Sequence, residues 1–69
     1  MKLEDFRIEV ARLTRQDLSV LSKVSVSTIQ RAEEGQTIRR LMRARILEGF
    51  SKHLGRQVTR DEIDEFQQS

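Results

Sequence analysis

The sequence predicts an all-α fold, a compact bundle of five short helices in a single domain over residues 1–69. Three observations predict it. Apolar residues recur at intervals of three and four along nearly the whole chain, as in helices with one buried face. No proline interrupts that pattern. A chain of 69 residues, with 36% hydrophobic and 35% charged side chains, suffices for one small core.

The first helix is expected over about 3–12. Its apolar residues follow the spacing i, i+3, i+7 and i+10, and they are Leu3, Phe6, Val10 and Leu13. The alternative is a strand, because Phe6, Ile8 and Val10 also alternate with polar residues. We favour the helix because no second strand is available to pair with this one.

A second helix, about 15–22, is expected to begin after Thr14. The stretch T-R-Q-D has the pattern of a capping box, with the Thr14 hydroxyl at the N-cap and the Asp17 carboxylate at N3. This helix would bury Leu18 and Leu21.

A third helix, about 26–34, is expected to begin after Ser25 as its N-cap. Ile29 and Ala32 lie three residues apart and form its inner face. Gly35 ends it, because glycine enters the left-handed conformation at low cost.

A long fourth helix is expected over about 38–54 and ends at Gly55. Leu41 and Leu47 lie beside an apolar row with i+4 spacing. That row consists of Ile38, Met42, Ile46, Phe50 and Leu54.

The last helix is expected after Thr59, which begins T-R-D-E with Glu62 at N3. It would bury Ile63. Val20 and Phe66 are harder to place in the core, and with this helix they could form a patch for self-association.

The second and third helices are joined by only about three residues, Lys23–Ser25, which is the spacing of a helix-turn-helix. So short a turn makes the helices cross steeply, and the third helix then projects from the bundle. With Ile29 facing inward, a rotation of ~100° per residue places four polar side chains outward. They are Ser27, Gln30, Arg31 and Glu34, with Thr28 on the flank. Such a face could enter a DNA major groove; the alternative is a hairpin that only fills the bundle.

The segment Leu13–Gly35 reads L-T-R-Q-D-L-S-V-L-S-K-V-S-V-S-T-I-Q-R-A-E-E-G. It resembles the helix-turn-helix of Cro- and phage-repressor-type DNA-binding proteins. The resemblance extends more weakly to Leu54-Gly55 and to Val58 through Ile63. It implies a lambda-repressor-like arrangement with a helix-turn-helix at about 15–34. The function it implies is sequence-specific binding of double-stranded DNA and transcriptional regulation, often as a homodimer.

The resemblance also implies roles for individual residues. Val26, Ser27 and Arg31 fall at base-reading positions, beside Gln30 on the outward face. Ser25 and Thr28 fall near the phosphate backbone. Arg15 replaces a glutamine that contacts the backbone, and Glu33 would pair with Arg7 or Arg12.

Two departures from the family's pattern carry structural expectations. Lys23 stands where the family usually has a glycine with positive φ, which predicts about 1 kcal/mol of strain. Ser19 and Ser22 replace small alanines between the two helices, so their hydroxyls need an acceptor such as the carbonyl one turn back.

Positive charge is concentrated in the middle of the chain. Residues 35–60 carry seven basic side chains and one acidic side chain. Arg39, Arg40 and Arg43 lie at the start of the long helix, where cations oppose the helix dipole. A docked phosphate would make this arrangement favourable, and we therefore predict phosphate contacts for these three arginines. The alternative is local ion pairing with Glu33 or Glu34.

The composition argues against other classes of function. With no cysteine and one histidine, His53, we expect no metal and no cofactor. No pair of groups has acid–base spacing, so we expect no enzyme. No stretch resembles a membrane span or a signal peptide, and we expect a cytoplasmic protein without membrane contact.

Two other binding functions stay open. Helix 38–54 could be a basic amphipathic helix that docks on an acidic protein groove or an anionic membrane. Burial of its apolar row within the monomer would argue against that interpretation. The chain could also be an RNA-binding or sigma-like subdomain, which competition between duplex DNA and RNA would distinguish.

Overall fold

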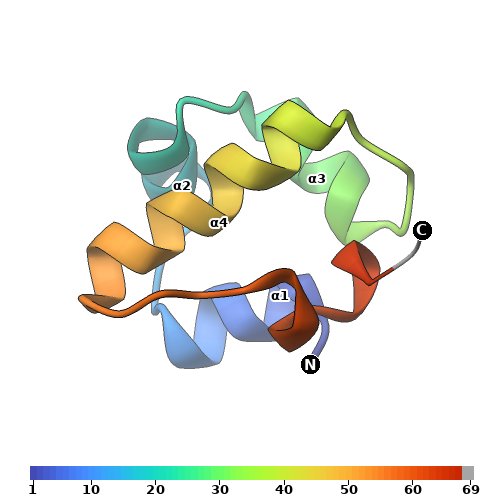
Figure 1. The fold of residues 1–69 in the computed structure, drawn as a ribbon. Coiled ribbons are helices and arrows are strands. Elements are labelled where there is room, and N and C mark those ends of the chain that lie inside the picture. Colours follow the sequence, from blue (N-terminus) through green and yellow to red (C-terminus); the bar gives the residue numbers. More distant parts are fainter. Residues whose placement is uncertain (68–69) are drawn as a thin grey trace.

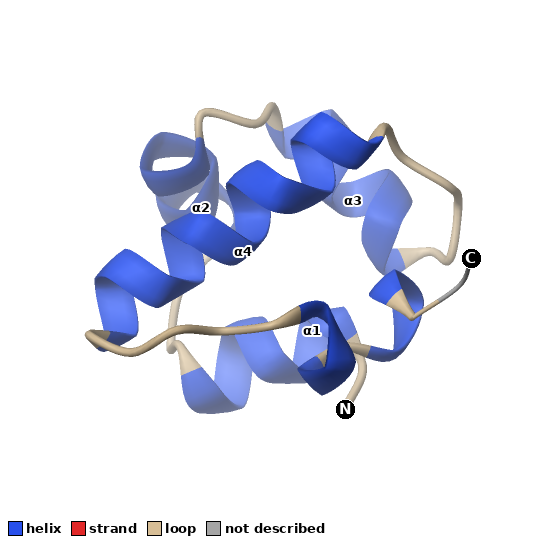
Figure 2. Ribbon diagram, in the orientation of Figure 1, coloured by secondary structure: helices blue, strands red, loops and turns tan. Residues whose placement is uncertain are grey.

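The computed structural model describes residues 1–67, and these are helical without any strand (Figure 2). The elements in chain order are α1 (Leu3–Asp5), the π-helical turn η1 (Phe6–Val10), α2 (Arg15–Ser22), α3 (Val26–Glu33), α4 (Arg40–Leu54) and the 3₁₀ turns η2 (Arg60–Glu62) and η3 (Asp64–Phe66). The predicted all-α class is confirmed. Figure 1 shows α4 crossing the molecule, with the C-terminal segment returning past α1.

The N-terminal helix covers α1 and η1 without a break, so the strand alternative for Phe6–Val10 is wrong. The helix widens at its end, where the Ala11 N–H donates to the Phe6 carbonyl at 3.0 Å across five residues. It ends at Val10 rather than at residue 12 because Arg12 takes a left-handed conformation with φ of 57°.

The N-caps of α2 and α3 are confirmed. The Thr14 hydroxyl accepts a hydrogen bond from the Asp17 N–H at 3.0 Å, and the Asp17 carboxylate accepts from the Thr14 N–H at 3.2 Å. The Ser25 hydroxyl accepts from the Thr28 N–H at 3.2 Å. Gly35 follows α3 with φ of 87°, as a helix-ending glycine should.

Two boundaries of the prediction need correction. The long helix begins at Arg40 instead of residue 38, because Arg39 is the extended N-cap residue with ψ of 146°. The expected fifth helix is replaced by the two 3₁₀ turns η2 and η3, so the structure has four helices followed by these turns. Ile63 separates η2 from η3 in an extended conformation and is fully buried, which interrupts any continuous helix.

The capping contact at the start of η2 is nevertheless present. The Thr59 N–H donates to the Glu62 carboxylate at 3.1 Å, and the Arg56 guanidinium lies 3.0 Å from the same carboxylate. The Arg56 hydrogen bond, and then the Thr59 N–H, lower the pKa of Glu62 below its ordinary value.

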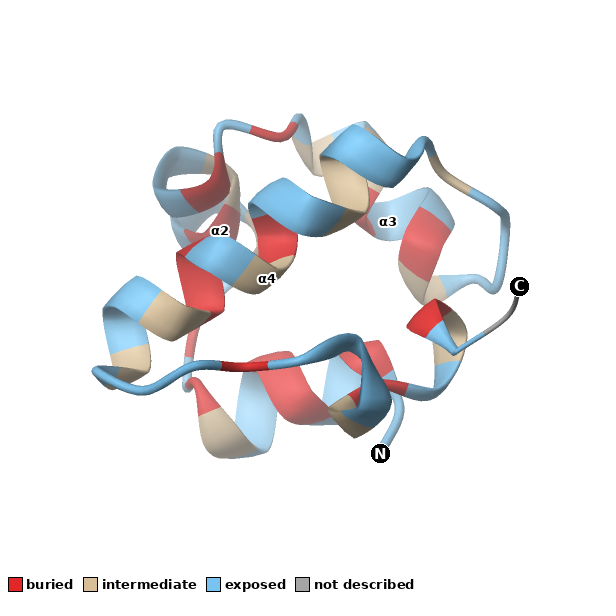
Figure 3. Cartoon of the chain, in the orientation of Figure 1, coloured by how far each residue is buried: buried red, intermediate tan, exposed pale blue. Residues whose placement is uncertain are grey.

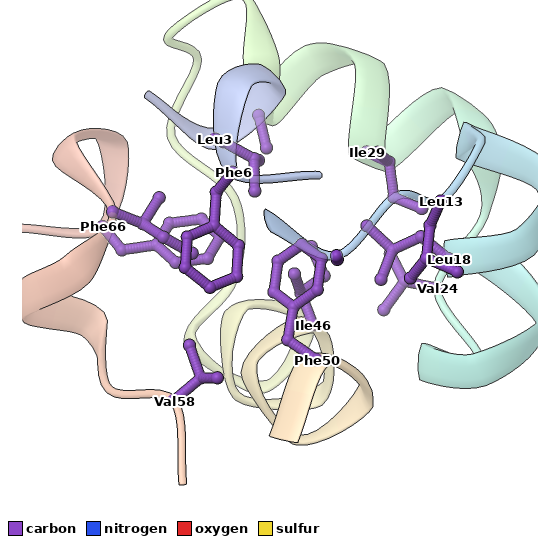
Figure 4. Close-up of a cluster of buried hydrophobic side chains, with 13 residues drawn as sticks. Leu3, Phe6, Leu13, Leu18, Val24, Ile29, Ile46, Phe50, Val58 and Phe66 are labelled. Carbon is purple, nitrogen blue, oxygen red and sulfur yellow. The ribbon is translucent and has the colours of Figure 1, made fainter. Parts of the chain in front are cut away.

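The core takes side chains from α1, η1, α2, α3, α4 and η3 (Figure 4). Its centre is the pair Phe6 and Phe50, whose ring centroids lie 4.9 Å apart at 59°. The buried hydrophobic residues are Leu3, Phe6, Ala11, Leu13, Leu18, Val24, Ile29, Ala32, Ile46, Phe50, Val58, Ile63 and Phe66. Because Phe66 is part of this core, its expected place in a self-association patch is wrong, whereas Val20 is 69% exposed.

The packing of α2 on α4 corrects a second burial prediction. Leu18 and Ser22 face α4, and the Ser22 hydroxyl donates to the Leu18 carbonyl at 2.6 Å as predicted. Gly49 allows this close approach, since a Cβ there would lie 3.2 Å from the Ser22 Cα. Leu21 therefore points away from this contact and is exposed instead of buried.

The turn between α2 and α3 carries the predicted strain. Lys23 adopts φ of 59° and ψ of 33°, the left-handed region that disfavours a side chain with a Cβ. We expect Lys23→Gly to raise the free energy of unfolding by about 0.5–1 kcal/mol, because the relief of strain exceeds the added freedom of the unfolded chain. Urea titration monitored by circular dichroism measures this change. Lys23→Ala is the control, since it keeps the Cβ; an equal gain from alanine would contradict the explanation.

Candidate nucleic-acid interface

One face of α3 projects into solvent, as the sequence predicts (Figure 3). Ser27, Gln30 and Arg31 are exposed, whereas Ile29 and Ala32 on the opposite face are buried. The other two predicted site residues of this helix, Val26 and Thr28, are half-buried at its sides.

Hydrogen bonds connect three side chains of this face. The Ser25 hydroxyl donates to the Thr28 hydroxyl at 2.9 Å, and the Arg31 guanidinium donates to the same Thr28 oxygen at 3.2 Å. The contact holds Arg31 along the helix while leaving its remaining N–H donors free for a ligand. The sequence analysis did not predict this chain of bonds, although the spacing of three residues between its members is the available signal.

The start of α4 carries three arginines, Arg39, Arg40 and Arg43, which we call the arginine cluster. Arg39 and Arg40 are exposed and Arg43 is half-buried. Within residues 1–67, no carboxylate lies within 4.0 Å of any of the three guanidinium groups. The local ion pairs considered as an alternative are therefore not formed. The cluster combines uncompensated positive charge with a helix start whose N-cap side chain makes no capping hydrogen bond.

The structure brings Arg39 of the arginine cluster next to α3. The loop after α3 turns the chain back to the start of α4 (Figure 1). A hollow on the surface is lined from α3 by Thr28 and Arg31, and from the start of α4 by Arg39. Arg40 and Arg43 line a neighbouring hollow. Of the base-reading and phosphate-binding candidates, Thr28, Arg31 and Arg39 thus share one hollow, and Arg40 and Arg43 line the next one.

Glu33 does not neutralise the arginine cluster because its carboxylate already pairs with two other arginines. Its carboxylate accepts from the Arg7 Nε at 2.6 Å and from the Arg15 guanidinium at 2.9 Å. Arg7 also donates to the Leu13 carbonyl at 3.0 Å. The predicted pairing of Glu33 with the first helix is confirmed for Arg7, while Arg12 forms no ion pair within the described residues.

Arg15 is the predicted site residue that the structure sets apart. Its guanidinium lies 2.9 Å from the Glu33 carboxylate and 3.7 Å from that of Glu4, and it lines neither hollow of the arginine cluster. The sequence analysis missed this second pairing of Glu33. Nothing local to Arg15 indicated it, because the partner lies 18 residues away.

Among residues 1–67, no three histidine, cysteine, aspartate or glutamate side chains come close enough together to hold a metal ion. No helix in that part of the chain combines the length and apolar character needed to cross a membrane. His53 contacts the Ala11 carbonyl through its Nε2 at 2.9 Å near the end of α4. Comparison with family models, curated proteins and solved structures gave no match to this chain.

Proposed function

We propose that the protein is a sequence-specific DNA-binding protein and transcriptional regulator, with the helix-turn-helix at about 15–34 in a lambda-repressor-like arrangement. The observation that carries the proposal is the shared hollow lined by Arg31 of α3 and Arg39 of α4. A helix with its side chains is ~10–12 Å across, and the major groove of B-DNA is ~12 Å wide. An exposed helix flanked by unpaired arginines matches a groove flanked by phosphates.

In this proposal, the outward face of α3 reads the bases. Arg31 can donate two hydrogen bonds to the O6 and N7 atoms of a guanine, and Gln30 can pair with the N6 and N7 atoms of an adenine. Ser27 can donate or accept, and the methyl groups of Val26 can contact a thymine methyl.

The arginine cluster binds phosphates in this proposal. Its arginines lie at the start of α4, where the N-cap side chain makes no capping hydrogen bond, and a helix start with nearby guanidinium groups suits an anion. Thr28 lines the same hollow as Arg39 and supplies a hydroxyl group, and Ser25 is hydrogen-bonded to it. Arg15 is paired with Glu33 and lies near Glu4, so in this proposal it contacts a phosphate through its remaining N–H donors. These contacts set affinity and salt dependence without reading sequence.

We expect Arg31→Ala to weaken specific DNA binding by about 1–3 kcal/mol while leaving nonspecific binding nearly intact. The reason is that a bidentate contact to a base discriminates between sequences, whereas a phosphate contact does not. Fluorescence anisotropy on the selected site and on a scrambled duplex measures both affinities. Arg60→Ala is the matched control, since Arg60 is exposed in η2. Equal losses on the two duplexes would instead make Arg31 a phosphate contact.

Selection from random duplex oligonucleotides by the purified chain tests the function directly. We expect enrichment of one motif, and a two-fold symmetric motif if the protein binds as a homodimer with half-sites ~34 Å apart. Competition in a gel shift with duplex DNA and with RNA of the same sequence shows which of the two nucleic acids the protein binds in preference. The absence of any enriched motif, or preferential competition by RNA, would reject the proposal.

The protein–protein alternative built on the apolar row of α4 has less support. Ile46 and Phe50 are fully buried, and Ile38 and Met42 pack against the core. A helix whose apolar row is already used inside the monomer has little of it to offer a partner.

A further inference from the structure

A separate hollow lies between the end of α2 and the middle of α4. Its apolar lining consists of Leu21, Leu41 and Ala44. Leu41 is 57% exposed and Leu21 is 39% exposed, so neither leucine contributes to the core. Two exposed leucines from different helices that line one hollow form a binding groove more readily than scattered surface residues do. We call this hollow the α2–α4 groove.

The groove is separate from the hollows that the arginine cluster lines. Its α4 residues span ~140° around the helix at ~100° per residue. They are Leu41, Ala44, Arg45, Glu48, Gly49 and Lys52. None of the residues that line the groove lines either hollow of the arginine cluster.

The rim of the groove is positively charged. Lys23 and Arg45 are exposed and have no carboxylate within 4.0 Å among residues 1–67. Lys52 pairs with Glu48 at 3.0 Å on the surface. Three cations against one carboxylate leave a net positive rim around an apolar floor. A complementary ligand carries apolar side chains flanked by carboxylates.

The same charge argues against a second copy of this chain as the occupant. A two-fold contact through the groove would place the positive rim against itself, because the same patch is used on both subunits. Like charges that face each other across an interface are unfavourable. An acidic partner avoids this repulsion.

We propose that the α2–α4 groove is a docking site for an acidic amphipathic helix of another protein. The wall runs along α4 from Leu41 to Lys52, which at 1.5 Å per residue is ~16 Å, or about three helical turns. A helix of that length with leucines at i, i+4 and i+7 places its apolar side chains against Leu21 and Leu41 and its carboxylates against Lys23 and Arg45.

Titration of the whole chain with a fluorescein-labelled peptide tests the proposal. The peptide has about four helical turns, leucine at i, i+4 and i+7, and glutamate at most other positions. We expect a Kd of roughly 10–500 μM and amide chemical-shift changes that centre on Leu21, Leu41 and Ala44. We expect Leu41→Asp to weaken binding about tenfold or more. Ile8→Asp is the matched control, because Ile8 is 51% exposed on the N-terminal helix, and it should leave the affinity within about twofold.

Arg45→Glu provides a second variant that leaves the apolar floor intact, and it should also weaken binding by about tenfold. Three outcomes would overturn the proposal. The first is equal binding of a scrambled peptide, which would indicate charge attraction alone. The second is shift changes on Ser27, Arg31 and Arg39, with displacement by duplex DNA. The third is self-association of the chain through the groove. Because DNA binding is measured on the same samples, failure of the groove and failure of the proposed DNA function are distinguishable.

Discussion

Glu33→Gln is expected to lower the free energy of unfolding by about 3–5 kcal/mol. The Glu33 side chain is 3% exposed and the Arg7 side chain is 8% exposed, with 2.6 Å between the carboxylate and the Arg7 Nε. Glutamine keeps the size of the side chain but removes the charge that compensates a buried guanidinium, and its amide N–H groups face the donors of Arg7 and Arg15. A chain of 69 residues has a total stability of only about 3–10 kcal/mol, so we expect the variant to be largely unfolded at 37 °C.

Urea unfolding monitored by circular dichroism measures this loss, with Glu34→Gln as the control on the adjacent exposed residue. The control should stay within about 0.5 kcal/mol of the unsubstituted protein. Adding Arg7→Met to Glu33→Gln should recover part of the stability, because it removes the uncompensated charge. A loss below about 1 kcal/mol for Glu33→Gln would show that Arg7 is not effectively desolvated.

Arg39→Gln combined with Arg40→Gln is expected to make the plot of log K against log salt concentration shallower by about 2. Each phosphate contact contributes ~0.9 to that slope through counterion release. At about 1.5 kcal/mol for each charge-assisted hydrogen bond, nonspecific affinity should fall by about 100-fold. Anisotropy measured over a series of salt concentrations gives both quantities.

The matched control for this pair is Lys2→Gln combined with Arg60→Gln, which removes the same charge from exposed residues outside the interface. Equal slopes for the two double variants would show that the effect depends on net charge alone. The arginine cluster would then not contact the DNA. Stability supplies an independent readout. Removing cations from the start of α4 should raise the free energy of unfolding by about 0.3–1 kcal/mol for each arginine, which opposes the change in DNA affinity.

Local signals in the sequence located the starts of α2 and α3. The hydroxyl of Thr14 with the carboxylate of Asp17, and the hydroxyl of Ser25, fixed where α2 and α3 begin. Each signal involves groups three residues apart, so it is already present in a short segment of chain. The positive φ of Lys23 matches what the resemblance implied, because the family usually has a glycine with positive φ at this position.

In the C-terminal segment, local signals predict the capping contact but not the structure that follows it. The Thr59–Glu62 contact forms as predicted, yet the chain does not continue as a helix beyond η2. Ile63 has an extended conformation instead and is buried in the core, and Phe66 three residues later is buried as well. A capping contact is formed by neighbouring residues, whereas the choice between helix and extended chain after it depends on burial against distant elements.

The sequence by itself determined the helical class, the N-caps of α2 and α3 and the outward face of α3, because these depend on periodicity and on bonds within a few residues. Only the tertiary structure decided that Leu21 faces solvent, that Glu33 binds Arg7 and Arg15, and that Arg39 shares a hollow with Arg31. The physical reason is distance along the chain. Arg7 and Glu33 are 26 residues apart, and their meeting depends on how α1, α2 and α3 pack together rather than on any local preference.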